Sequence, residues 1–133
     1  MMKKNKIFFI VNALHSKKNK NLKKLIRTKF LSEKYDVNIL ISEYKGHCIK
    51  LAEEAVEKKA NIVVACGGDG TINEVGQSLI KKPVLLGVIP LGSGNGFARH
   101  FNIPRNLNYA LDIISKNFST TIDVGKINKR FFF

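Results

Sequence analysis

The sequence predicts an α/β domain of three layers, in which helices cover both faces of a parallel sheet. Short apolar runs alternate along the chain with segments whose apolar residues recur every three or four positions. The runs are rich in β-branched and aromatic residues and lack polar alternation, which is typical of strands buried on both faces. The 133 residues fit one domain, and no repeat or low-complexity linker interrupts them. Strands that alternate with helices build βαβ units with crossovers over the sheet.

The first half of the chain supplies two strands and two helices. Residues 6–12, KIFFIVN, and residues 35–42, YDVNILIS, are apolar runs and predict the first two strands. Between them, one buried helical stripe is predicted at Leu22, Leu25, Ile26 and Phe30. A second helix is predicted over residues 47–59, and Gly46 marks its start.

The second half repeats the alternation. The elements predicted there are a strand at 61–65, a helix at 71–80, a strand at 83–90, and helices near 97–101 and 107–115. The end of the chain, TTIDVGKINKRFFF, is typical of a strand, a turn and the beginning of a further strand. Its three terminal aromatic residues would ordinarily be buried, so we expect the chain to be a piece of a longer fold.

The positive charge is concentrated near the N-terminus. The formal net charge is +13, and residues 1–34 hold eleven of the 23 Lys and Arg residues against one acid, Glu33. Such a surface attracts nucleic acid, anionic lipid or a phosphorylated substrate, and it is also typical of a solvated helix face. Lys outnumbers Arg by nineteen to four and few aromatic residues interleave with the basic run, so we expect no nucleic acid partner. A peripheral membrane contact through basic residues 3–34 stays open beside the solvated face.

The sequence also indicates a cytoplasmic protein. Cys48 and Cys66 have no CxxC spacing and no neighbouring His pair, so we expect reduced core thiols. No stretch approaches the ~18 apolar residues that span a bilayer. We therefore expect a soluble protein, with any membrane contact made from the inner face.

The stretch ACGGDGTINEV, residues 65–75, places glycines on both sides of Asp69 directly after a predicted strand. Asp-Gly is a strong hairpin signal, but a hairpin needs a period-2 strand afterwards, and TINEVGQSLI has a period near 3.6. Thr71 and Glu74 also match a capping box, in which the Thr hydroxyl caps the N3 amide and the Glu side chain reaches back. We therefore expect a helix to begin at the glycines.

This strand-to-helix junction is a candidate phosphate site, with a purely structural turn as the alternative. A helix N-terminus offers free N–H groups and the positive end of the helix dipole, which together bind phosphate. Gly67, Gly68 and Gly70 have no Cβ, so an anion can approach the backbone closely. Asp69 would repel a phosphate unless a cation lies between them, which implies Mg²⁺ held directly or through water.

A second glycine loop, PLGSGNGFARH at residues 90–100, follows the next predicted strand in the same way. Parallel strands end at the same edge of a sheet, so the two loops would converge on one crevice that suits an extended phosphorylated ligand. The Walker A motif fails because Ser93, not lysine, follows Gly92. The dinucleotide fingerprint fails because Phe97 stands where its last glycine belongs. Another class of phosphate-binding protein is indicated.

At these residues the sequence resembles the diacylglycerol kinase catalytic-domain family, which includes bacterial lipid kinases and sphingosine and ceramide kinases, and more distantly NAD kinases. The family's GGDGTxNE occurs unchanged at residues 67–74, and its P-x-G-[ST]-G-N-x-[FL]-A loop matches residues 90–98. NAD kinases share the first motif but not the second. Asn12, residues 42–52 and residues 121–128 match further family segments. The resemblance implies the nucleotide-binding fold of the NAD kinase and diacylglycerol kinase type.

The resemblance also implies an activity: transfer of the γ-phosphoryl group of ATP to a lipid hydroxyl, with Mg²⁺. Asp69 would be the catalytic residue that organises the metal and the phosphates, while the general base would come from a second domain. The residues implied to surround the nucleotide are Asn12, Ser42, Gly67, Gly68, Asp69, Gly70, Thr71, Asn73, Glu74, Gly92, Ser93, Gly94 and Asn95.

Three departures limit the resemblance. After Asn12 the family usually has Pro-x-Ser-Gly, whereas residues 13–16 are ALHS. Gly96 stands where many members have aspartate, which would leave Asp69 more exclusively responsible for the metal. Family members continue beyond the position of Phe133 into a β-rich domain that holds the acceptor site. We therefore expect the chain to be an N-terminal nucleotide-binding domain that ends early in the connection to a C-terminal domain.

Several functions stay open at this point. The first is an ATP-dependent lipid kinase acting on a diacylglycerol or sphingoid lipid. The second is a non-catalytic Mg-ATP-binding fragment or pseudokinase, which the altered segment after Asn12 favours. An NAD kinase-like enzyme and a basic nucleic-acid-binding module are less favoured. The sequence identifies neither the acceptor lipid nor the oligomeric state.

Overall fold

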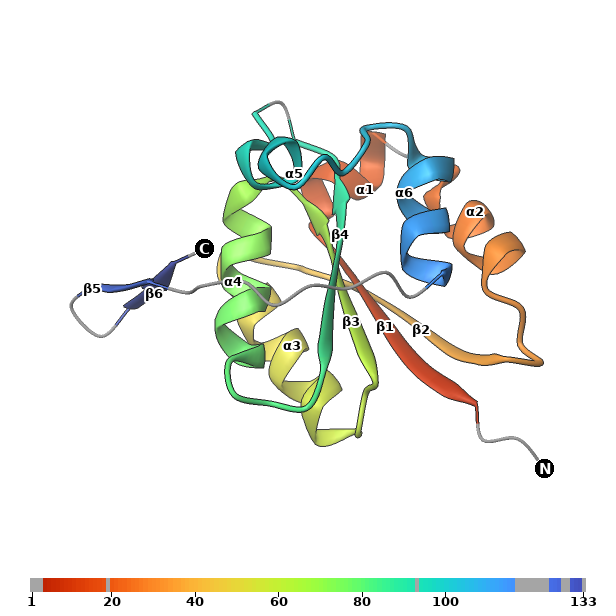
Figure 1. Cartoon of the computed structure of the whole chain (residues 1–133), viewed down its shortest axis with the longest axis horizontal. Helices are drawn as coiled ribbons and strands as arrows, with labels where there is room; N and C mark the ends of the chain where they lie inside the picture. The colour runs from red at the N-terminus through yellow and green to blue at the C-terminus, as the bar shows by residue number, and fades with distance from the viewer. Residues whose placement is uncertain (1–3, 19, 93, 117–124, 128–129, 133) are drawn as a thin grey trace.

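The core of the fold is a four-stranded parallel sheet in the order β2-β1-β3-β4 (Figure 1). The computed structural model describes residues 4–18, 20–92, 94–116, 125–127 and 130–132. The strands of the sheet are β1 Asn5–Val11, β2 Tyr35–Ile41, β3 Ile62–Gly67 and β4 Leu85–Pro90. All of their pairings are parallel, which confirms the predicted architecture.

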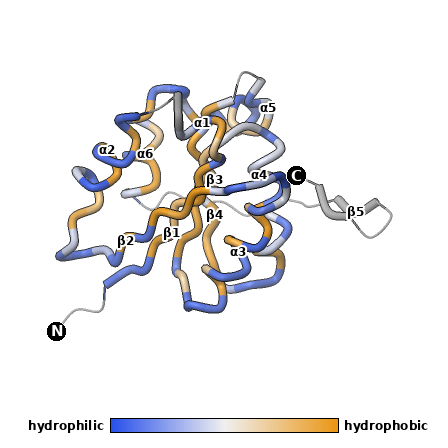
Figure 2. The backbone as a smooth tube through the Cα atoms, turned by 180° about the vertical axis from the view of Figure 1, so that it is seen from behind, coloured by the Kyte–Doolittle hydropathy of each residue, from blue (hydrophilic) through white to orange (hydrophobic). Residues whose placement is uncertain are grey.

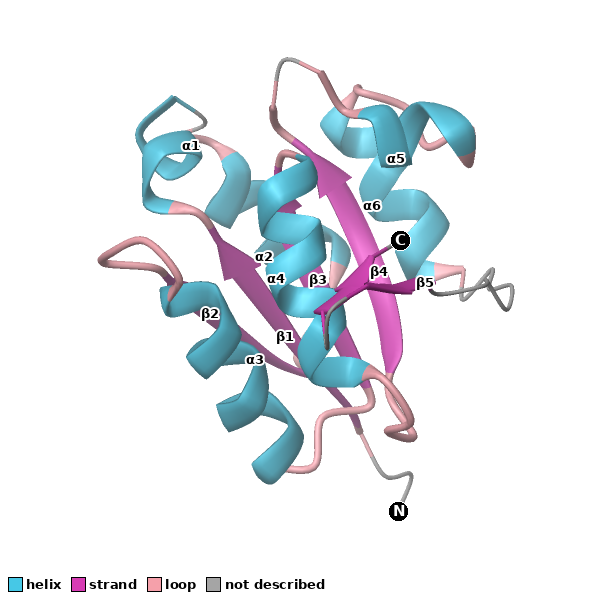
Figure 3. Cartoon of the chain, turned by 90° about the vertical axis from the view of Figure 1, so that its left-hand side faces the viewer, coloured by secondary structure: helices cyan, strands magenta, loops and turns pink. Residues whose placement is uncertain are grey.

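Helices cover both faces of this sheet. They are α1 Ala13–Lys18, α2 Leu22–Lys29, α3 His47–Glu57, α4 Asp69–Leu79, α5 Gly96–His100 and α6 Leu107–Ser115. α3 and α4 lie side by side on one face, and α2 and α6 lie on the other (Figures 1 and 3). The arrangement has the three layers that the alternation of strands and helices predicts.

Alternate residues of β1 enter two separate apolar cores. Ile7, Phe9 and Val11 pack with α2 and α6, whereas Phe8 and Ile10 pack with α3 and α4. All five side chains are buried. A strand between two helical layers has no face in contact with water, so its sequence is apolar without alternation. Figure 2 shows the resulting hydrophobic band along the strands.

The two cysteines lie in different cores. Cys48 packs in the core beneath α3 and α4, and Cys66 packs in the core beneath α2 and α6. Burial raises the pKa of the Cys66 thiol. Burial also raises the pKa of Cys48, although a hydrogen bond with Ser42 acts in the opposite direction. Both thiols are free and buried, which confirms the prediction of reduced core cysteines.

The start of α4 differs from the sequence prediction. The helix begins at Asp69, and Gly68 is its N-cap residue with no side-chain cap hydrogen bond. Thr71 is therefore the third residue of the helix, and the predicted capping box between Thr71 and Glu74 is wrong. The prediction that the helix begins at the glycines is confirmed. Gly68, with an extended backbone, takes the N-cap position that the box assigned to Thr71, so the helix begins at Asp69 instead of Ile72.

The segment after Asn12 differs from the prediction, and the end of the chain agrees with it. α1 occupies the segment after Asn12, for which the sequence analysis predicted no helix. Near the end of the chain, β5 Gly125–Ile127 and β6 Arg130–Phe132 pair antiparallel. This pairing agrees with the predicted turn between two strands, although the first part of TTIDVGKINKRFFF lies outside the described residues.

The parallel sheet brings the carboxyl ends of its strands to one edge. Val11 lies opposite Ile41 of β2 and opposite Cys66 of β3. Gly67 lies opposite Pro90 of β4. The segments that follow the four strands therefore meet at this edge, where α1 and α5 lie at the top of Figure 1. We call it the carboxyl edge.

Candidate active site

The N-terminus of α4 lies at the carboxyl edge and has unused amide groups. The first backbone hydrogen bond of the helix runs from the Ile72 amide to the Gly68 carbonyl, at 3.1 Å. The amides of Asp69, Gly70 and Thr71 precede it and have no hydrogen-bond acceptor in the part of the chain that the structure describes. Asp69 and Gly70 are exposed. The arrangement provides three adjacent N–H groups at the positive end of the helix dipole.

The glycines of the two loops have different surroundings. A Cβ atom on Gly92 would lie 2.7 Å from the Gly68 Cα, so the two loops touch through their backbones. A Cβ on Gly67 would lie 2.5 Å from the Thr71 Oγ1. A Cβ on Gly70 would meet nothing within 4 Å. Gly67 and Gly92 are therefore required by packing, whereas the space in front of Gly70 is open.

The carboxylate of Asp69 joins the two loops. Its Oδ2 accepts a hydrogen bond from the Gly96 amide at 2.9 Å, and its Oδ1 accepts one from the Phe97 amide at 3.0 Å. Gly96 and Phe97 are the first residues of α5, so Asp69 holds the start of this short helix. The sequence motifs gave no signal for this contact, because Asp69 and α5 belong to different loops.

Asn95 shapes the second loop from inside. Its side chain is 2% exposed and its backbone is in the left-handed region, with φ 51°. Asparagine tolerates this conformation better than other residues with a Cβ. Its Nδ2 donates to the Gly92 carbonyl, while its Oδ1 is buried without a hydrogen-bond partner among the described residues. Gly94 is exposed, and Ser93 lies outside the described residues.

Asn12 and Ser42 hold the ends of β1 and β2 against α1. The Asn12 Oδ1 accepts from the Leu14 amide at 2.9 Å, and the Ser42 Oγ accepts from the Ala13 amide at 3.1 Å. The Asn12 Nδ2 lies 3.4 Å from the Thr71 Oγ1, to which it donates. Asn12 thus acts as an N-cap of α1, a signal in the sequence that could have predicted this helix.

The remaining predicted residues lie on different sides of α4. Asn73 lines a cleft of about 430 Å³ between α4 and α5, together with Asp69 and Ile72. Glu74 lies near Cys48 of α3, where its charge adds to the effect of burial in raising the pKa of that thiol. The structure therefore brings most predicted residues to one edge but separates Asn73 from Glu74.

Sequence reasoning missed the aromatic wall of this cleft. Phe97, His100 and Phe101 line it from α5 and from the residue that follows. The Phe97 and Phe101 rings have centroids 4.8 Å apart, and Phe101 is partly exposed. Their i, i+4 spacing on a short helix was the available signal.

Comparison with known proteins matches this architecture to one family. The model of the diacylglycerol kinase catalytic domain matches residues 6–127. The chain belongs to this family. Diacylglycerol kinases of Staphylococcus aureus strains JH9 and Newman are each 40% identical to it over 100 residues, which cover 74% of this chain and 32% of the relative.

Solved structures of the diacylglycerol kinase family share its fold. A diacylglycerol kinase structure from Bacillus anthracis str. Sterne has a TM-score of 0.82 and 28% sequence identity, and the match covers 99% of this chain and 47% of that chain. A second structure from the same strain has a TM-score of 0.82 and 29% identity. The chain thus spans about a third of the length of these curated relatives and about half that of the solved structures.

Proposed function

We propose that this chain is the nucleotide-binding part of an ATP-dependent lipid kinase, which transfers the γ-phosphoryl group of ATP to the hydroxyl of a diacylglycerol-type lipid. One observation carries the proposal: the amides of Asp69, Gly70 and Thr71 have no acceptor in the described residues. Free amides at a helix N-terminus bind phosphate groups. Membership of the diacylglycerol kinase catalytic-domain family supports ATP as the proposed source of these phosphates, and a sphingoid lipid is the second acceptor class to test.

The proposed reaction needs positioning more than covalent chemistry. The lipid hydroxyl oxygen forms a bond to the γ-phosphorus, the bond to the β–γ bridging oxygen breaks, and ADP leaves. The hydroxyl proton passes to a base, which we expect in the part of the relatives that this chain does not span. We propose that the backbone from Gly68 to Thr71 and the second glycine loop bind the nucleotide phosphates. Asn12 and Ser42 support them by fixing the neighbouring strand ends.

The site could hold Mg²⁺ only if phosphate groups of the substrate supply ligands beside Asp69. Each Asp69 oxygen already accepts one amide hydrogen bond and keeps lone pairs for a cation or its water. Within the described ranges, no three His, Cys, Asp or Glu side chains lie close enough to form a metal cage. Mg²⁺ commonly keeps several waters and takes its other ligands from one carboxylate and substrate phosphates. We propose Asp69 as that carboxylate, and the bound ion would neutralise phosphate charge.

A second candidate function is Mg-ATP binding without turnover. The chain covers 32% of the length of the S. aureus relatives, so the acceptor site of a whole enzyme need not lie within it. In this case the same α4 amides would bind the nucleotide, and no phosphoryl transfer would follow.

Contact between basic residues 3–34 and an anionic membrane is also proposed rather than established. None of the helices among the described residues is long and apolar enough to cross a membrane. The basic residues of this segment lie on several elements: Lys4 and Lys6 lie at the start of β1, and α2 carries Lys23, Lys24, Arg27 and Lys29.

The test measures binding and turnover separately. The chain is titrated with ATP in the presence and absence of Mg²⁺, and amide chemical shifts are followed by NMR; ADP release is then measured with diacylglycerol and with sphingosine vesicles. We expect Mg-dependent shifts centred on Asp69, Gly70 and Thr71. Binding without ADP release would favour the second candidate, and no ATP binding would contradict both.

A further inference from the structure

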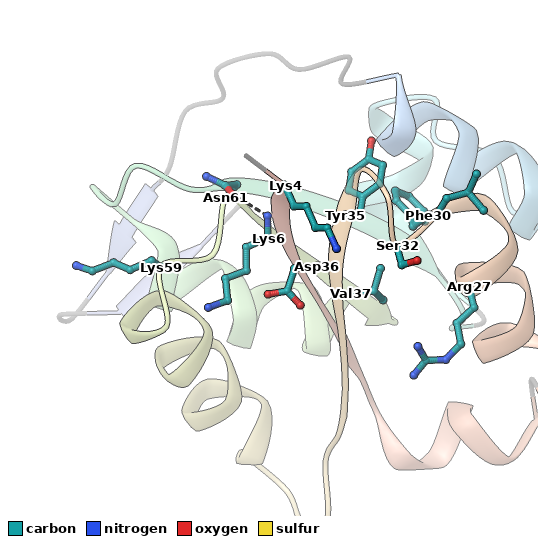
Figure 4. Close-up of a pocket in the computed structure, with 11 residues that line it drawn as sticks. Lys4, Lys6, Arg27, Phe30, Ser32, Tyr35, Asp36, Val37, Lys59 and Asn61 are labelled. Carbon is teal, nitrogen blue, oxygen red and sulfur yellow. Dashed lines mark hydrogen bonds between the residues drawn. The ribbon is translucent and has the colours of Figure 1, made fainter. Parts of the chain in front are cut away.

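A positively charged groove, drawn in Figure 4, lies where β1 and β2 begin. Because the glycine loops follow the carboxyl ends of the strands, the groove is at the opposite edge of the sheet. It has a volume of about 850 Å³ and is formed where β1 and β2 begin and where β3 is approached from α3. Lys4, Lys6, Arg27 and Lys59 line it, with Asp36 as a single carboxylate. Four cations against one anion make the groove strongly positive at neutral pH.

Among the residues that the structure describes, these four cations have no ion-pair partner. Within the described part of the chain, ion pairs join Lys29 to Asp112 and Lys58 to Glu54, and none includes a cation of the groove. Cations that line one concave surface repel each other, and the low-dielectric wall behind them strengthens the field that an anion experiences. A bound anion would remove this repulsion.

The remaining wall offers both apolar contact and hydrogen-bond donors. Phe30 is buried and Tyr35 is half-buried, and the Tyr35 hydroxyl is directed to the Ser115 carbonyl at 3.4 Å. The Asn61 Oδ1 accepts from the Lys6 amide at 2.8 Å, which leaves the Asn61 NH₂ group as a donor. Ser32 adds a hydroxyl. Tyr35 packs against the buried Phe30 with ring centroids 4.9 Å apart, so the wall suits a compact anion better than a stacked nucleic acid strand.

Lys59 occupies a backbone position that usually belongs to glycine. It follows α3 with φ 65°, and the bonds from the Lys59 amide to the Val56 carbonyl and from the Ala60 amide to the Ala55 carbonyl form a Schellman motif. A side chain at this left-handed position strains the backbone, and glycine would relieve the strain. The lysine at this position therefore places a cation in the groove, although it strains the backbone of the turn.

We propose that this groove is a second anion site, separate from the glycine loops, that binds a phosphate-bearing ligand with more than one negative charge. The ligand is either a soluble phosphorylated compound or a phospholipid headgroup, since both present the same oxygens to Lys and Arg. The proposal does not depend on ATP binding at α4, because the two sites lie at opposite edges of the sheet.

The test uses pyrophosphate without Mg²⁺ as the soluble probe. The ¹⁵N-labelled chain is titrated, and the amides of Lys6, Ser32 and Asn61 report the groove while those of Gly70 and Thr71 report the loops. We expect saturable shifts at the groove amides that weaken as salt is raised. The phospholipid headgroup is tested with cardiolipin vesicles, because this headgroup carries two phosphates, and phosphatidylcholine vesicles are the neutral control.

Matched double variants identify the residues responsible. Lys6→Gln/Lys59→Gly removes two groove cations, and Lys24→Gln/Lys81→Gly removes two exposed lysines outside it, the second also at positive φ. Whichever probe the wild-type groove binds, pyrophosphate or anionic vesicles, we expect the affinity of the groove variant for it to be lower by about fivefold or more. The affinity of the control variant should equal that of the wild type.

Two single variants, Lys59→Gly and Asp36→Asn, complete the test. Lys59→Gly relieves backbone strain, so a thermal melt should show no loss of stability and misfolding cannot explain weaker binding. Asp36→Asn removes the carboxylate and should tighten binding. Three results would overturn the proposal. The chemical shift changes could be confined to Gly70 and Thr71, the two double variants could bind the probe equally, or the chain could respond to neither pyrophosphate nor vesicles.

Discussion

At the scale of single residues, the glycines of the two loops perform different tasks. Gly92 packs against Gly68, Gly67 packs against Thr71, and Gly70 faces open space. The sequence predicted all of them as places where an anion approaches the backbone. It could not separate them, because the contact between the loops depends on the relative position of β3 and β4. Gly70 has the open surroundings that the sequence predicted, whereas Gly67 and Gly92 do not.

A pair of alanine substitutions tests this distinction. Gly92→Ala places a Cβ 2.7 Å from the Gly68 Cα, and neither backbone can move easily. We expect it to lower the free energy of unfolding by about 1–3 kcal/mol. Gly70→Ala meets nothing within 4 Å in a helix and should be neutral or stabilising by up to about 1 kcal/mol. Urea unfolding measures both values, and equal losses would contradict the packing role of Gly92.

Asp69 is the residue whose role changed most between sequence and structure. It was predicted as a metal ligand, a role that stays a prediction, and the structure adds a bridge to the Gly96 and Phe97 amides. In Asp69→Asn one acceptor oxygen becomes an NH₂ group that faces an amide donor. We expect a loss of about 1–3 kcal/mol in the free energy of unfolding. Asp36→Asn is the control, because this exposed carboxylate makes no such bond among the described residues.

The Asp69 substitution also has a local readout. Amide hydrogen exchange of Gly96 and Phe97 should become faster in Asp69→Asn than in the Asp36→Asn control, because the two amides lose their acceptors. Unchanged exchange at both amides, with stability equal to that of the control, would show that the carboxylate does not hold α5.

At the scale of elements, short helices at the carboxyl edge were harder to predict than the long ones. The apolar stripes of α3, α4 and α6 follow helical spacing, so their existence was predictable from the sequence. α1 has six residues and begins in a segment that departs from the family pattern. Its start depends on Asn12, whose Oδ1 binds the Leu14 amide. The contact partner of Asn12, Thr71, is 59 positions away and could not be read from local sequence.

A cap substitution tests the role of Asn12. Asn12→Ala removes the α1 cap and the bond to Thr71, and we expect a loss of about 1 kcal/mol in unfolding free energy with faster amide exchange in α1. Asn21 is the matched control, because it precedes α2 at the N-cap position without a side-chain cap bond. An Asn12→Ala effect no larger than that of Asn21→Ala would contradict the capping role.

At the scale of the whole molecule, one parallel sheet separates two cores whose buried side chains are distinct among the described residues, and the partly buried Ile103 packs against both. Cys66 and Cys48 lie in different cores, and burial raises the pKa of both thiols. The thiolate is the reactive form, so a raised pKa leaves less of it at a given pH. The buried apolar runs made this architecture predictable, whereas the assignment of each strand residue to one core required the register.

Thiol alkylation tests whether the two cores open together. At pH 8 we expect both cysteines of the folded chain to resist iodoacetamide and both to react rapidly in urea, with the same midpoint of exposure. Mass spectrometry of the two cysteine peptides measures each separately. A midpoint for Cys48 clearly below that of Cys66 would contradict cooperative unfolding of the three layers.

The central claim is that the free amides at the start of α4 bind nucleotide phosphates, and a side chain at Gly70 tests it most directly. Gly70→Val fills the open space before these amides, while Gln77→Val places the same side chain farther along α4. Calorimetric titration with Mg-ATP should show affinity lowered about tenfold or more in Gly70→Val and unchanged in Gln77→Val, with both variants folded. Equal affinities for Mg-ATP in the two variants would contradict the claim.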